Sequence, residues 1–327
     1  MNIAFVSTAH VHTKGYIDRI LSATDGSEVG AIWDDVPERG RRYAEQAGAP
    51  FVADLHALLA DPKMDGFVIC SENTRHLALL KQVLPVGKPV LCEKPVVTTL
   101  ADLAALRALH AHYPAPLFCG YFHPFGGQIQ AIAQLVREGA LGKITRVRYR
   151  NAHHAAYGRW FDSPDFQWFF EPTLSGGGAF MDMGTHALHL LRTFFGPVQE
   201  VWAEIGNHSG IYPTVDDYGI AHLRFASGVL GTVEASWTQT GGINGLEVVG
   251  SEKTIWNTKD GYVISGSNES ITPITGIPTR IDRLVAVING EIEAEALQAD
   301  LEATFDTVAI MAAAYASAQK GCWVPVG

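Results

Sequence analysis

The first third of the chain alternates short apolar runs with amphipathic segments, and this pattern restricts the possible folds more than any other feature. The predicted strands are residues 3–6, 29–33, 66–70, 90–92 and 117–119. Residues that begin or end helices occur between these strands. Pro37 can begin one helix, Gly48 can end it, and Thr99 can cap a later helix. Strands that are apolar throughout and alternate with helices predict a parallel sheet covered on both faces.

The rest of the chain has a different pattern, in which apolar and polar residues alternate. Val233 and Ala235 share one face of a predicted strand, whereas Thr232 and Glu234 share the other. Such alternation predicts a mostly antiparallel sheet with one packed face. Further strands are expected at residues 144–150, 218–225, 246–249 and 254–256, and helices at residues 128–138, before Phe195 and at 297–319. Because 327 residues exceed the usual size of one core, we predict two domains, residues 1–120 and 121–327.

Charge and cysteine usage restrict the partners and the compartment. The net charge is −10 and no basic run occurs, which argues against nucleic acid or an acidic membrane surface as a partner. The N-terminus lacks the features of a signal peptide, and no membrane span is visible. The cysteines are far apart and mostly in apolar runs, as expected for free thiols in the cytoplasm: Cys70, Cys92, Cys119 and Cys322.

The loop after the first strand is the first candidate binding site. In a doubly wound sheet, ligands bind at the carboxyl ends of the strands, and a Gly-x-Gly-x-x-Gly loop there approaches a dinucleotide's pyrophosphate. None of the three glycines is present here, although small residues stand at the first two places and His12 at the third. The candidate cofactor-binding residues of this loop are Ser7, Thr8, Ala9, His10 and Val11.

An acidic pair supports the dinucleotide hypothesis. Asp34 ends the second strand about twenty residues beyond the loop, where a carboxylate hydrogen-bonds the ribose hydroxyls. Asp35 follows it, and two adjacent carboxylates would repel a 2′-phosphate, so NAD is favoured over NADP. The alternative interpretation is that both residues begin a turn and cap the helix that Pro37 opens.

The string Gly87-Lys88-Pro89-Val90-Leu91-Cys92-Glu93-Lys94-Pro95 is the most specific in the sequence. Its strand delivers Glu93 and Lys94 to the edge of the sheet where a nicotinamide ring would lie. An ammonium there can polarise a substrate hydroxyl or carbonyl and stabilise a developing alkoxide. The alternative is a strand end that carries a solvated ion pair.

With this segment the sequence resembles the Gfo/Idh/MocA oxidoreductases, which include glucose-fructose oxidoreductase and inositol dehydrogenases. The resemblance covers nearly the whole chain. The segments that carry it, besides the Glu-Lys-Pro string, are residues 65–69 with Asn73 and His76, residues 139–144, Gly176-Gly177-Gly178 with Asp182, Gly184 and His186, Asp216-Asp217-Tyr218 and Gly250-Ser251.

The resemblance implies an α/β fold: an N-terminal Rossmann dinucleotide-binding domain and a C-terminal α/β domain with a large open, mostly antiparallel sheet. It also implies hydride transfer between NAD and a hydroxyl-bearing carbon of a sugar or cyclitol. Lys94 would assist proton transfer, His186 would be the general acid/base, and Asp182 would orient it or contact substrate. The implied cofactor-binding residues beyond the first loop are Asp34, Ser71, Glu72, Asn73, His76, Glu93 and Lys94.

The chain departs from the family pattern at three places. The glycine loop is lost, Glu72 replaces a usual proline, and His189 stands where the family has aspartate. Asp182, His186 and His189 could converge on one face as a zinc site. His10-Val11-His12 also resembles the metal-binding pair of amidohydrolase barrels, but the second half offers no eight-stranded parallel barrel. We therefore expect no metal and keep the Asp182, His186, His189 set as the alternative.

Aromatic and imidazole residues suit stacking on, and hydrogen bonding to, a polyol. The candidates for substrate contact are Tyr121, His123, His153, His154, Tyr157, Trp160, Trp168 and His189, some of which could instead be core or subunit interface.

Three alternative functions stay open from the sequence: an NAD-retaining eliminase or hydrolase, a metal-dependent hydrolase or lyase, and a non-catalytic ligand sensor. Because the open sheet has a face too large to leave wet, we expect a homodimer or homotetramer through it.

Overall fold

The computed structural model describes residues 1–267 and 269–327, which form two compact units. The first unit comprises residues 1–121, 164–168 and 278–304, and the second comprises 122–163, 169–277 and 305–327. The units differ from the predicted division after residue 120, since two later segments join the first unit. Each unit is described by itself.

The first unit contains a five-stranded parallel sheet with the order β2-β1-β3-β4-β5. Its strands are β1 (Asn2–Val6), β2 (Glu28–Trp33), β3 (Met64–Ile69), β4 (Val90–Cys92) and β5 (Leu117–Cys119). The strands β1, β4 and β5 are buried almost throughout, as the continuous apolar runs predicted. The order reverses at β1, so the switch point between β1 and β3 lies beside the loop that the sequence marked as a binding site.

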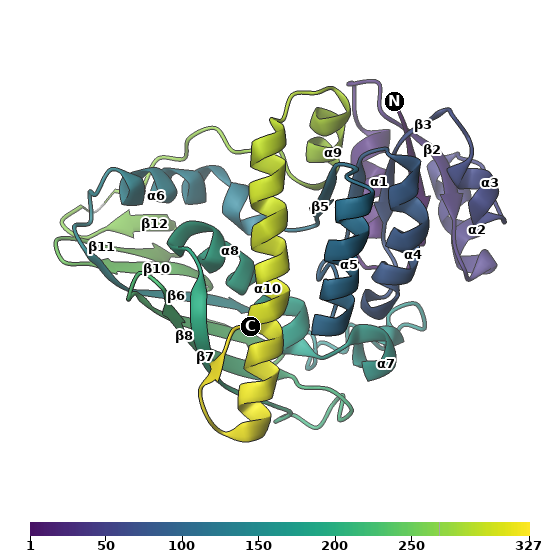
Figure 1. Ribbon diagram of the computed structural model, residues 1–327. Helices are drawn as coiled ribbons and strands as arrows, with labels where there is room; N and C mark the ends of the chain where they lie inside the picture. Colours follow the sequence, from purple (N-terminus) through teal and green to yellow (C-terminus); the bar gives the residue numbers. More distant parts are fainter. Residues whose placement is uncertain (268) are drawn as a thin grey trace. The chain divides into compact units, whose positions relative to one another are not determined.

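The helices of this unit follow the predicted strand–helix alternation (Figure 1). They are α1 (Thr13–Leu21), α2 (Pro37–Ala47), α3 (Leu55–Leu59), α4 (His76–Val83) and α5 (Leu100–His112), with short 3₁₀ turns η1 (Asn73–Arg75) and η2 (Leu84–Val86). Pro37 begins α2, Gly48 ends it in a left-handed conformation, and the Thr99 side chain caps α5 by accepting from the Asp102 amide.

Helix α9 (Arg280–Ile288) is one of the later segments that join the first unit. Its apolar residues Ile281, Leu284 and Val285 pack into the same buried cluster as Leu91 and Phe118 of the parallel sheet. An amphipathic helix near the end of the sequence therefore completes the core of the first unit, and the sequence pattern alone did not reveal this helix.

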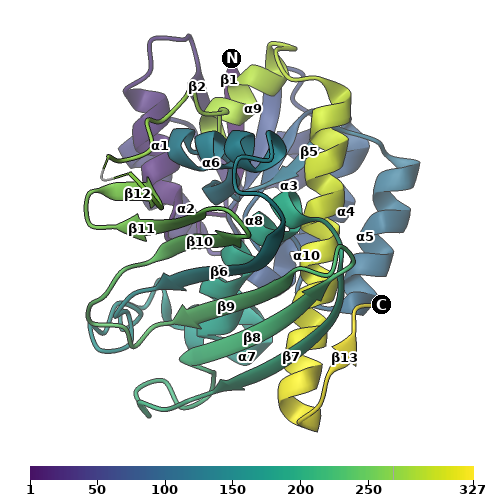
Figure 2. The ribbon, with the colours of Figure 1, turned by 90° about the vertical axis from the view of Figure 1, so that its left-hand side faces the viewer.

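The second unit contains an eight-stranded sheet with the order β12-β11-β10-β6-β9-β8-β7-β13, seen strand beside strand in Figure 2. Within the described residues, β6 and β9 pair in parallel and the other neighbouring strands of this sheet pair antiparallel. This confirms the predicted mostly antiparallel sheet. The strands are β6 (Ile144–Ala152), β7 (Val198–Gly206), β8 (Tyr218–Phe225), β9 (Leu230–Ser236), β10 (Gly245–Gly250), β11 (Thr254–Thr258), β12 (Gly261–Ile264) and β13 (Val324–Pro325). Strands β7, β12 and β13 were not predicted.

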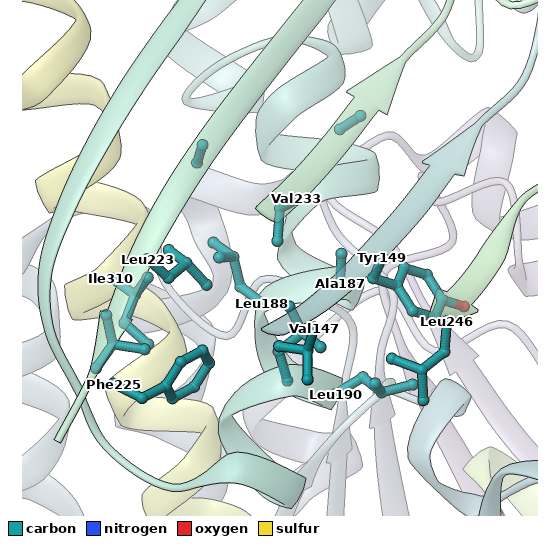
Figure 3. Packing of buried hydrophobic residues seen from close by; sticks show 14 of the residues in the cluster. Val147, Tyr149, Ala187, Leu188, Leu190, Leu223, Phe225, Val233, Leu246 and Ile310 are labelled. Atoms are coloured by element: carbon teal, nitrogen blue, oxygen red, sulfur yellow. The ribbon is translucent and has the colours of Figure 1, made fainter. Parts of the chain in front are cut away.

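One face of this sheet is covered by helices and holds the core of the second unit. Figure 3 shows Leu188 and Leu190 of α8 among Val147, Leu223 and Val233 of the sheet. The helical elements are η3 (His123–Phe125), α6 (Gly127–Arg137), η4 (Gln167–Phe170), α7 (Pro172–Ser175), the π-helical turn η5 (Phe180–Gly184), α8 (Thr185–Phe195) and α10 (Ala294–Lys320). Residues of α10 up to Thr304 belong to the first unit, and those from Phe305 onward belong to the second.

The cysteine prediction is confirmed, because Cys70, Cys92 and Cys119 are buried free thiols and Cys322 is an exposed one. Across the described residues, no helix is both long and apolar enough to cross a membrane.

Candidate functional site

The backbone of the loop after β1 forms hydrogen bonds to other groups of the protein. Ser7 adopts a left-handed backbone (φ 68°), a conformation that glycine adopts without strain. The amides of Thr8, His10 and His12 donate to the Asp34 carboxylate, the Cys70 carbonyl and the His10 ring. Three amides that a glycine loop would present to an anion are thus already used.

Trp168 packs on the same loop. Its indole nitrogen donates to the Ala9 carbonyl at 3.1 Å, and its ring lies 6.0 Å from that of His10. Trp168 was a candidate for stacking on a substrate, but it is buried and belongs to the first unit. This tryptophan fixes the loop instead.

Asp34 is buried and its oxygens are already occupied. Thr8 donates to it from the amide and the hydroxyl, at 2.7 and 2.5 Å. Arg39 adds two guanidinium bonds, at 3.0 and 2.8 Å, and the Val36 amide adds one at 2.7 Å. Five donors fill the roughly four lone-pair positions of a carboxylate. A ribose hydroxyl could bind Asp34 only by displacing one of them.

Arg39 also organises the charges around this carboxylate. It lies 3.2 Å from Asp35 and 3.4 Å from Glu72, and the Arg75 side chain pairs with both of these acids. The sequence did not single out Arg39, although a basic residue five positions after Asp34 was the available signal. The two guanidinium groups thus place positive charge beside the buried Asp34 and Glu72 and the exposed Asp35.

Three other residues expected to contact the cofactor are enclosed by the protein. The ring of His76 is fully buried, with its nitrogens 2.8 Å from the Pro95 carbonyl and 3.3 Å from the Ser71 carbonyl. Burial lowers the pKa of His76, which favours a neutral ring, and a neutral ring donates to one of these two carbonyls only. Ser71 donates to the Glu72 carbonyl, and Asn73 is buried at the start of η1.

Glu93 is the centre of a second buried charge cluster, at the end of β4. Its carboxylate accepts from His12 Nδ1 at 3.0 Å, from the Tyr16 hydroxyl and from the Lys94 amide at 3.1 Å. His10 Nε2 lies 3.8 Å away. Burial alone would raise the pKa of Glu93, but the charges of His10, His12 and Lys94 outweigh it and hold that pKa well below its usual range.

Lys94 follows directly, with 3% of its surface exposed, and the Lys94–Pro95 peptide is cis. A buried ammonium at the carboxyl edge of a parallel sheet is a fixed positive charge, which is suited to an oxygen that gains negative charge in a reaction. The structure thus places Lys94 at the strand end that the sequence predicted.

In the second unit, the η5 turn and α8 carry Asp182 and His186. The Asp182 carboxylate accepts from the Trp237 indole at 3.0 Å. The His186 ring lies 5.0 Å from that of His123, whose Nδ1 is hydrogen-bonded to the Tyr149 hydroxyl. Burial raises the pKa of Tyr149, so this hydroxyl keeps its proton and can donate it to the hydrogen bond. The sequence identified His123 but missed both Tyr149 and Trp237.

The alternative zinc site, made of Asp182, His186 and His189, does not form a cluster in the described part of the chain. Ligand atoms within 4.8 Å of one another are found in His10, His12 and Glu93, and not in Asp182, His186 and His189. His189 is fully buried in α8.

The remaining substrate candidates divide by exposure. Tyr121 is buried in the first unit, whereas Tyr157 and Trp160 are exposed in the second. The Trp160 ring lies 4.8 Å from that of His153 and 5.1 Å from that of His154. This aromatic and imidazole group is available to a polar ligand.

Comparison with known proteins assigns the chain to a family. Residues 1–121 match the oxidoreductase family with an NAD-binding Rossmann fold, and residues 129–256 match the GFO/IDH/MocA C-terminal domain. The chain belongs to the Gfo/Idh/MocA oxidoreductase family.

Curated relatives of this Gfo/Idh/MocA protein are dehydrogenases and reductases. A myo-inositol 2-dehydrogenase from Thermotoga maritima is 28% identical over 247 residues, covering 72% of this chain and 69% of the relative. A 1,5-anhydro-D-fructose reductase from Ensifer adhaerens is 28% identical over 235 residues, covering 70% of this chain and 68% of the relative.

Solved structures show the same fold over the whole chain. GenD2 from gentamicin A biosynthesis, in complex with NAD, has a TM-score of 0.79 at 23% identity and covers 100% of this chain and 96% of its own. Levoglucosan dehydrogenase in complex with NADH has a TM-score of 0.78 at 19% identity and covers 100% and 99%. The predicted family, the predicted fold and the oxidoreductase class are confirmed.

NAD is the cofactor of this Gfo/Idh/MocA Rossmann domain. The residues at the end of β2 present a conflict to NAD that the residues at the end of β4 do not. The end of β4 offers the buried Lys94 ammonium. At the end of β2, Asp34 has its acceptors filled by Thr8 and Arg39. The role predicted for Asp34 toward the ribose therefore stays a prediction that requires Thr8 or Arg39 to give way.

Proposed function

We propose that this protein is an NAD-dependent dehydrogenase or reductase that acts on a hydroxyl-bearing carbon of a sugar, cyclitol or related polyol. Family membership supports the hydride-transfer chemistry. The names of the curated relatives, which act on inositol and 1,5-anhydro-D-fructose, support the substrate class. The observation that carries the proposal in this chain is the buried ammonium of Lys94 at the carboxyl end of β4.

NAD supplies the hydride acceptor or donor at the nicotinamide. The protein contributes the handling of charge and protons on the substrate oxygen. Lys94 stabilises that oxygen as it gains negative charge, because a preorganised buried cation is worth more there than in water. Glu93 accepts from the Lys94 amide and so fixes the backbone that carries the ammonium.

His186 is proposed to accept and return the substrate proton, as a general acid/base. An imidazole suits this task because its ordinary pKa lies near neutral pH. His123 lies beside it, and Tyr149 holds the ring of His123 through a hydrogen bond. Asp182 contributes a carboxylate whose orientation is set by the Trp237 indole. Tyr149 and Trp237 are therefore positioning residues.

The test is activity on a panel of polyols and sugars with NAD⁺, compared between the wild-type protein and Lys94→Ala. Removing one donor that stabilises transition-state charge lowers kcat by about 10²–10³-fold. NAD affinity, measured by quenching of tryptophan fluorescence, stays within about tenfold, because the ammonium acts mainly in the transition state. Equal activity in Lys94→Ala would refute the mechanism.

A ligand sensor is a second candidate, favoured by the occupied acceptors of Asp34 and by the amides used within the first loop. A sensor binds its ligand without turnover. Saturable binding of a polyol, with no NADH formed or consumed across the panel, would favour it over a dehydrogenase.

We also propose that two or four copies associate through the open face of the eight-stranded sheet. Partly buried side chains from neighbouring strands pair on this sheet: the rings of Trp202 and His222 lie 5.5 Å apart, and Arg150 lies 2.6 Å from Glu234. Light scattering coupled to size exclusion tests this, and a monomer at micromolar concentration would exclude it.

A further inference from the structure

The loop that lost its glycines gathers two imidazoles and a carboxylate. His10 and His12 come from the segment between β1 and α1, and Glu93 comes from the end of β4. Each residue offers one ligand atom, and the three atoms lie within 4.8 Å of one another. We propose that His10, His12 and Glu93 bind one divalent transition-metal ion of the zinc or iron(II) class.

The ligand set matches the chemistry of such ions. Two histidines and one glutamate form catalytic zinc sites that keep an open position, and two histidines with one carboxylate also hold non-haem iron(II). Harder ions such as calcium and magnesium prefer sets made of oxygen ligands only. The two imidazoles therefore select against them.

The spacing of the donor atoms is close to that of ligands around one ion. Its Nε2 lies 3.8 Å from Glu93 Oε2, which is beyond hydrogen-bond range. Two ligands of one tetrahedral zinc ion, each at about 2.0–2.1 Å from the metal, lie about 3.3–3.4 Å apart. The 3.0 Å separation of His12 Nδ1 and Glu93 Oε1 is close to the same value. Small side-chain movements would bring all three to one ion.

The surroundings hold the carboxylate in place. The Tyr16 hydroxyl and the Lys94 amide donate to Glu93, and such outer contacts orient a ligand before the metal arrives. Gly120 packs so closely that an added Cβ would meet Glu93 Oε2 at 2.9 Å. Glycine at position 120 therefore leaves the space that the Glu93 carboxylate occupies.

Binding of an ion at His10 Nε2 changes the hydrogen bond at its other ring nitrogen. Its Nδ1 accepts a bond from the His12 amide at 3.3 Å, at the long limit for N–H···N contacts. An ion at Nε2 needs the proton on Nδ1, so this contact is given up. The bond is long and weak, whereas the buried Glu93 gains a divalent counter-charge.

An open coordination position is available on the side of His12. The His12 side chain is 27% exposed, whereas those of His10 and Glu93 are 1% and 0% exposed. His12 and Tyr16 also line a cavity of about 350 Å³ together with Arg19 and Arg280. An anionic oxygen in this cavity is the class of ligand that fits the remaining position.

The competing explanation is a purely proton-based network in which His12, Tyr16 and Lys94 satisfy Glu93 without a metal. The experiment that separates the two uses the full chain, stripped with a chelator and free of NAD and substrate. Zinc binding is measured by titration calorimetry, metal content by mass spectrometry, and the coordination geometry by the visible spectrum of a cobalt(II) derivative.

We expect one ion per chain and a cobalt spectrum typical of four- or five-coordinate geometry. His12→Asn, His10→Ala and Glu93→Gln should each weaken zinc binding more than about 100-fold, since even the loss of an outer-shell contact costs 10–100-fold. His154→Ala, at an exposed histidine outside the cluster, should bind zinc like the wild-type protein.

Substoichiometric zinc in the wild-type protein, or stoichiometric zinc that is unchanged in all three variants, would overturn the proposal. Circular dichroism confirms folding, and His12→Asn at a partly exposed position keeps the test valid if the buried variants do not fold. Because no NAD is present, the result is independent of whether the proposed dehydrogenase activity is found.

Discussion

Two histidine pairs in this protein look alike in sequence and differ in structure. His10 and His12 lie two residues apart in a loop, and His186 and His189 lie three apart on α8. Each pair has a candidate carboxylate, Glu93 or Asp182. The loop pair gathers around its carboxylate, with His12 at 3.0 Å from Glu93. The helical pair does not, since Asp182 accepts from Trp237 and His186 lies against His123.

The difference teaches that spacing along the chain is a poor guide to convergence. The helical spacing of His186 and His189 suggested a shared face, but in the described part of the chain their ligand atoms do not gather with that of Asp182. The loop pair needed a partner 81 residues away, brought to it by the β1-β3-β4 order of the sheet. A parallel sheet gathers distant strand ends at one edge, so its switch point assembles sites that no local motif shows.

The largest expected effect separates the roles of the two pairs. His186→Asn should lower kcat by about 10²–10⁴-fold, the usual contribution of a positioned acid/base. It should leave zinc stoichiometry unchanged, whereas His12→Asn should remove zinc binding. Steady-state kinetics and metal analysis on the same preparations measure both. Loss of zinc in His186→Asn would mean that the α8 pair, and not the loop pair, binds metal.

The second prediction tests whether buried carboxylates in the first unit depend on fixed cations, as we infer for Glu93. Arg39→Met removes the guanidinium that makes two bonds to Asp34 and leaves a buried charge. Breaking a buried pair in this way costs about 3–5 kcal/mol of the free energy of unfolding.

The control for this prediction removes both charges. Arg39→Met with Asp34→Asn should recover part of the loss, because the Asp34 carboxylate is no longer left buried without its guanidinium and Glu72 keeps Arg75. Urea denaturation measures all three proteins. A single variant as stable as the wild-type protein would show that Asp34 is free to bind another group.

A matched pair of variants compares the two carboxylates directly. Tyr16→Phe and Trp237→Phe each remove one hydrogen-bond donor, to Glu93 and to Asp182, and keep an aromatic ring. Tyr16→Phe should cost about 1.5–3 kcal/mol of stability, because water cannot replace a donor to a fully buried carboxylate.

Trp237→Phe should cost less from the lost bond, since Asp182 is only partly buried and water can donate to it, but it adds the cost of a cavity because Trp237 is fully buried. The effect that reports on Asp182 is a fall in kcat with KM nearly unchanged, because Asp182 loses its orientation. Thermal or urea unfolding measures the first effect and steady-state kinetics the second. Similar stability losses without a change in kcat would make Trp237 a structural residue only.

The sequence predicted most of the fold because the spacing of apolar residues along the chain indicates which side chains are buried. The strands of the parallel sheet and the strand β8 (Tyr218–Phe225) follow from apolar runs and alternation. Helix α9 was missed although its apolar residues Ile281, Leu284 and Val285 recur at helical spacing. The local pattern indicates a helix but not its partners, which are strands more than 160 residues earlier in the chain.

The candidate site was less predictable than the fold. Lys94 could be placed because a strand ends just before it. The hydrogen bonds from Arg39 to Asp34 could not be predicted. A sequence motif assigns the carboxylate to a ligand, but it does not show which donors of the protein itself reach that carboxylate. The sequence showed His12 at a glycine place and the resemblance of His10-Val11-His12 to a metal-binding pair, but their partner Glu93 became visible only in three dimensions.

The smallest expected effect comes from an exposed carboxylate of the first unit, Asp25, which is the solvated counterpart of Glu93. The hydroxyl and amide of Ser27 and the guanidinium of Arg19 donate to it and lower its pKa from 3.8 to about 2. Because the folded-state pKa is depressed, the stabilisation is present above about pH 4 and is lost as the pH falls toward 2. Solvent screening limits it to less than about 1 kcal/mol. Asp25→Asn should therefore shift the urea midpoint slightly at pH 6, and the difference from the wild-type protein should shrink at pH 3. A shift at pH 6 as large as that of Tyr16→Phe would show that burial does not separate these two carboxylates.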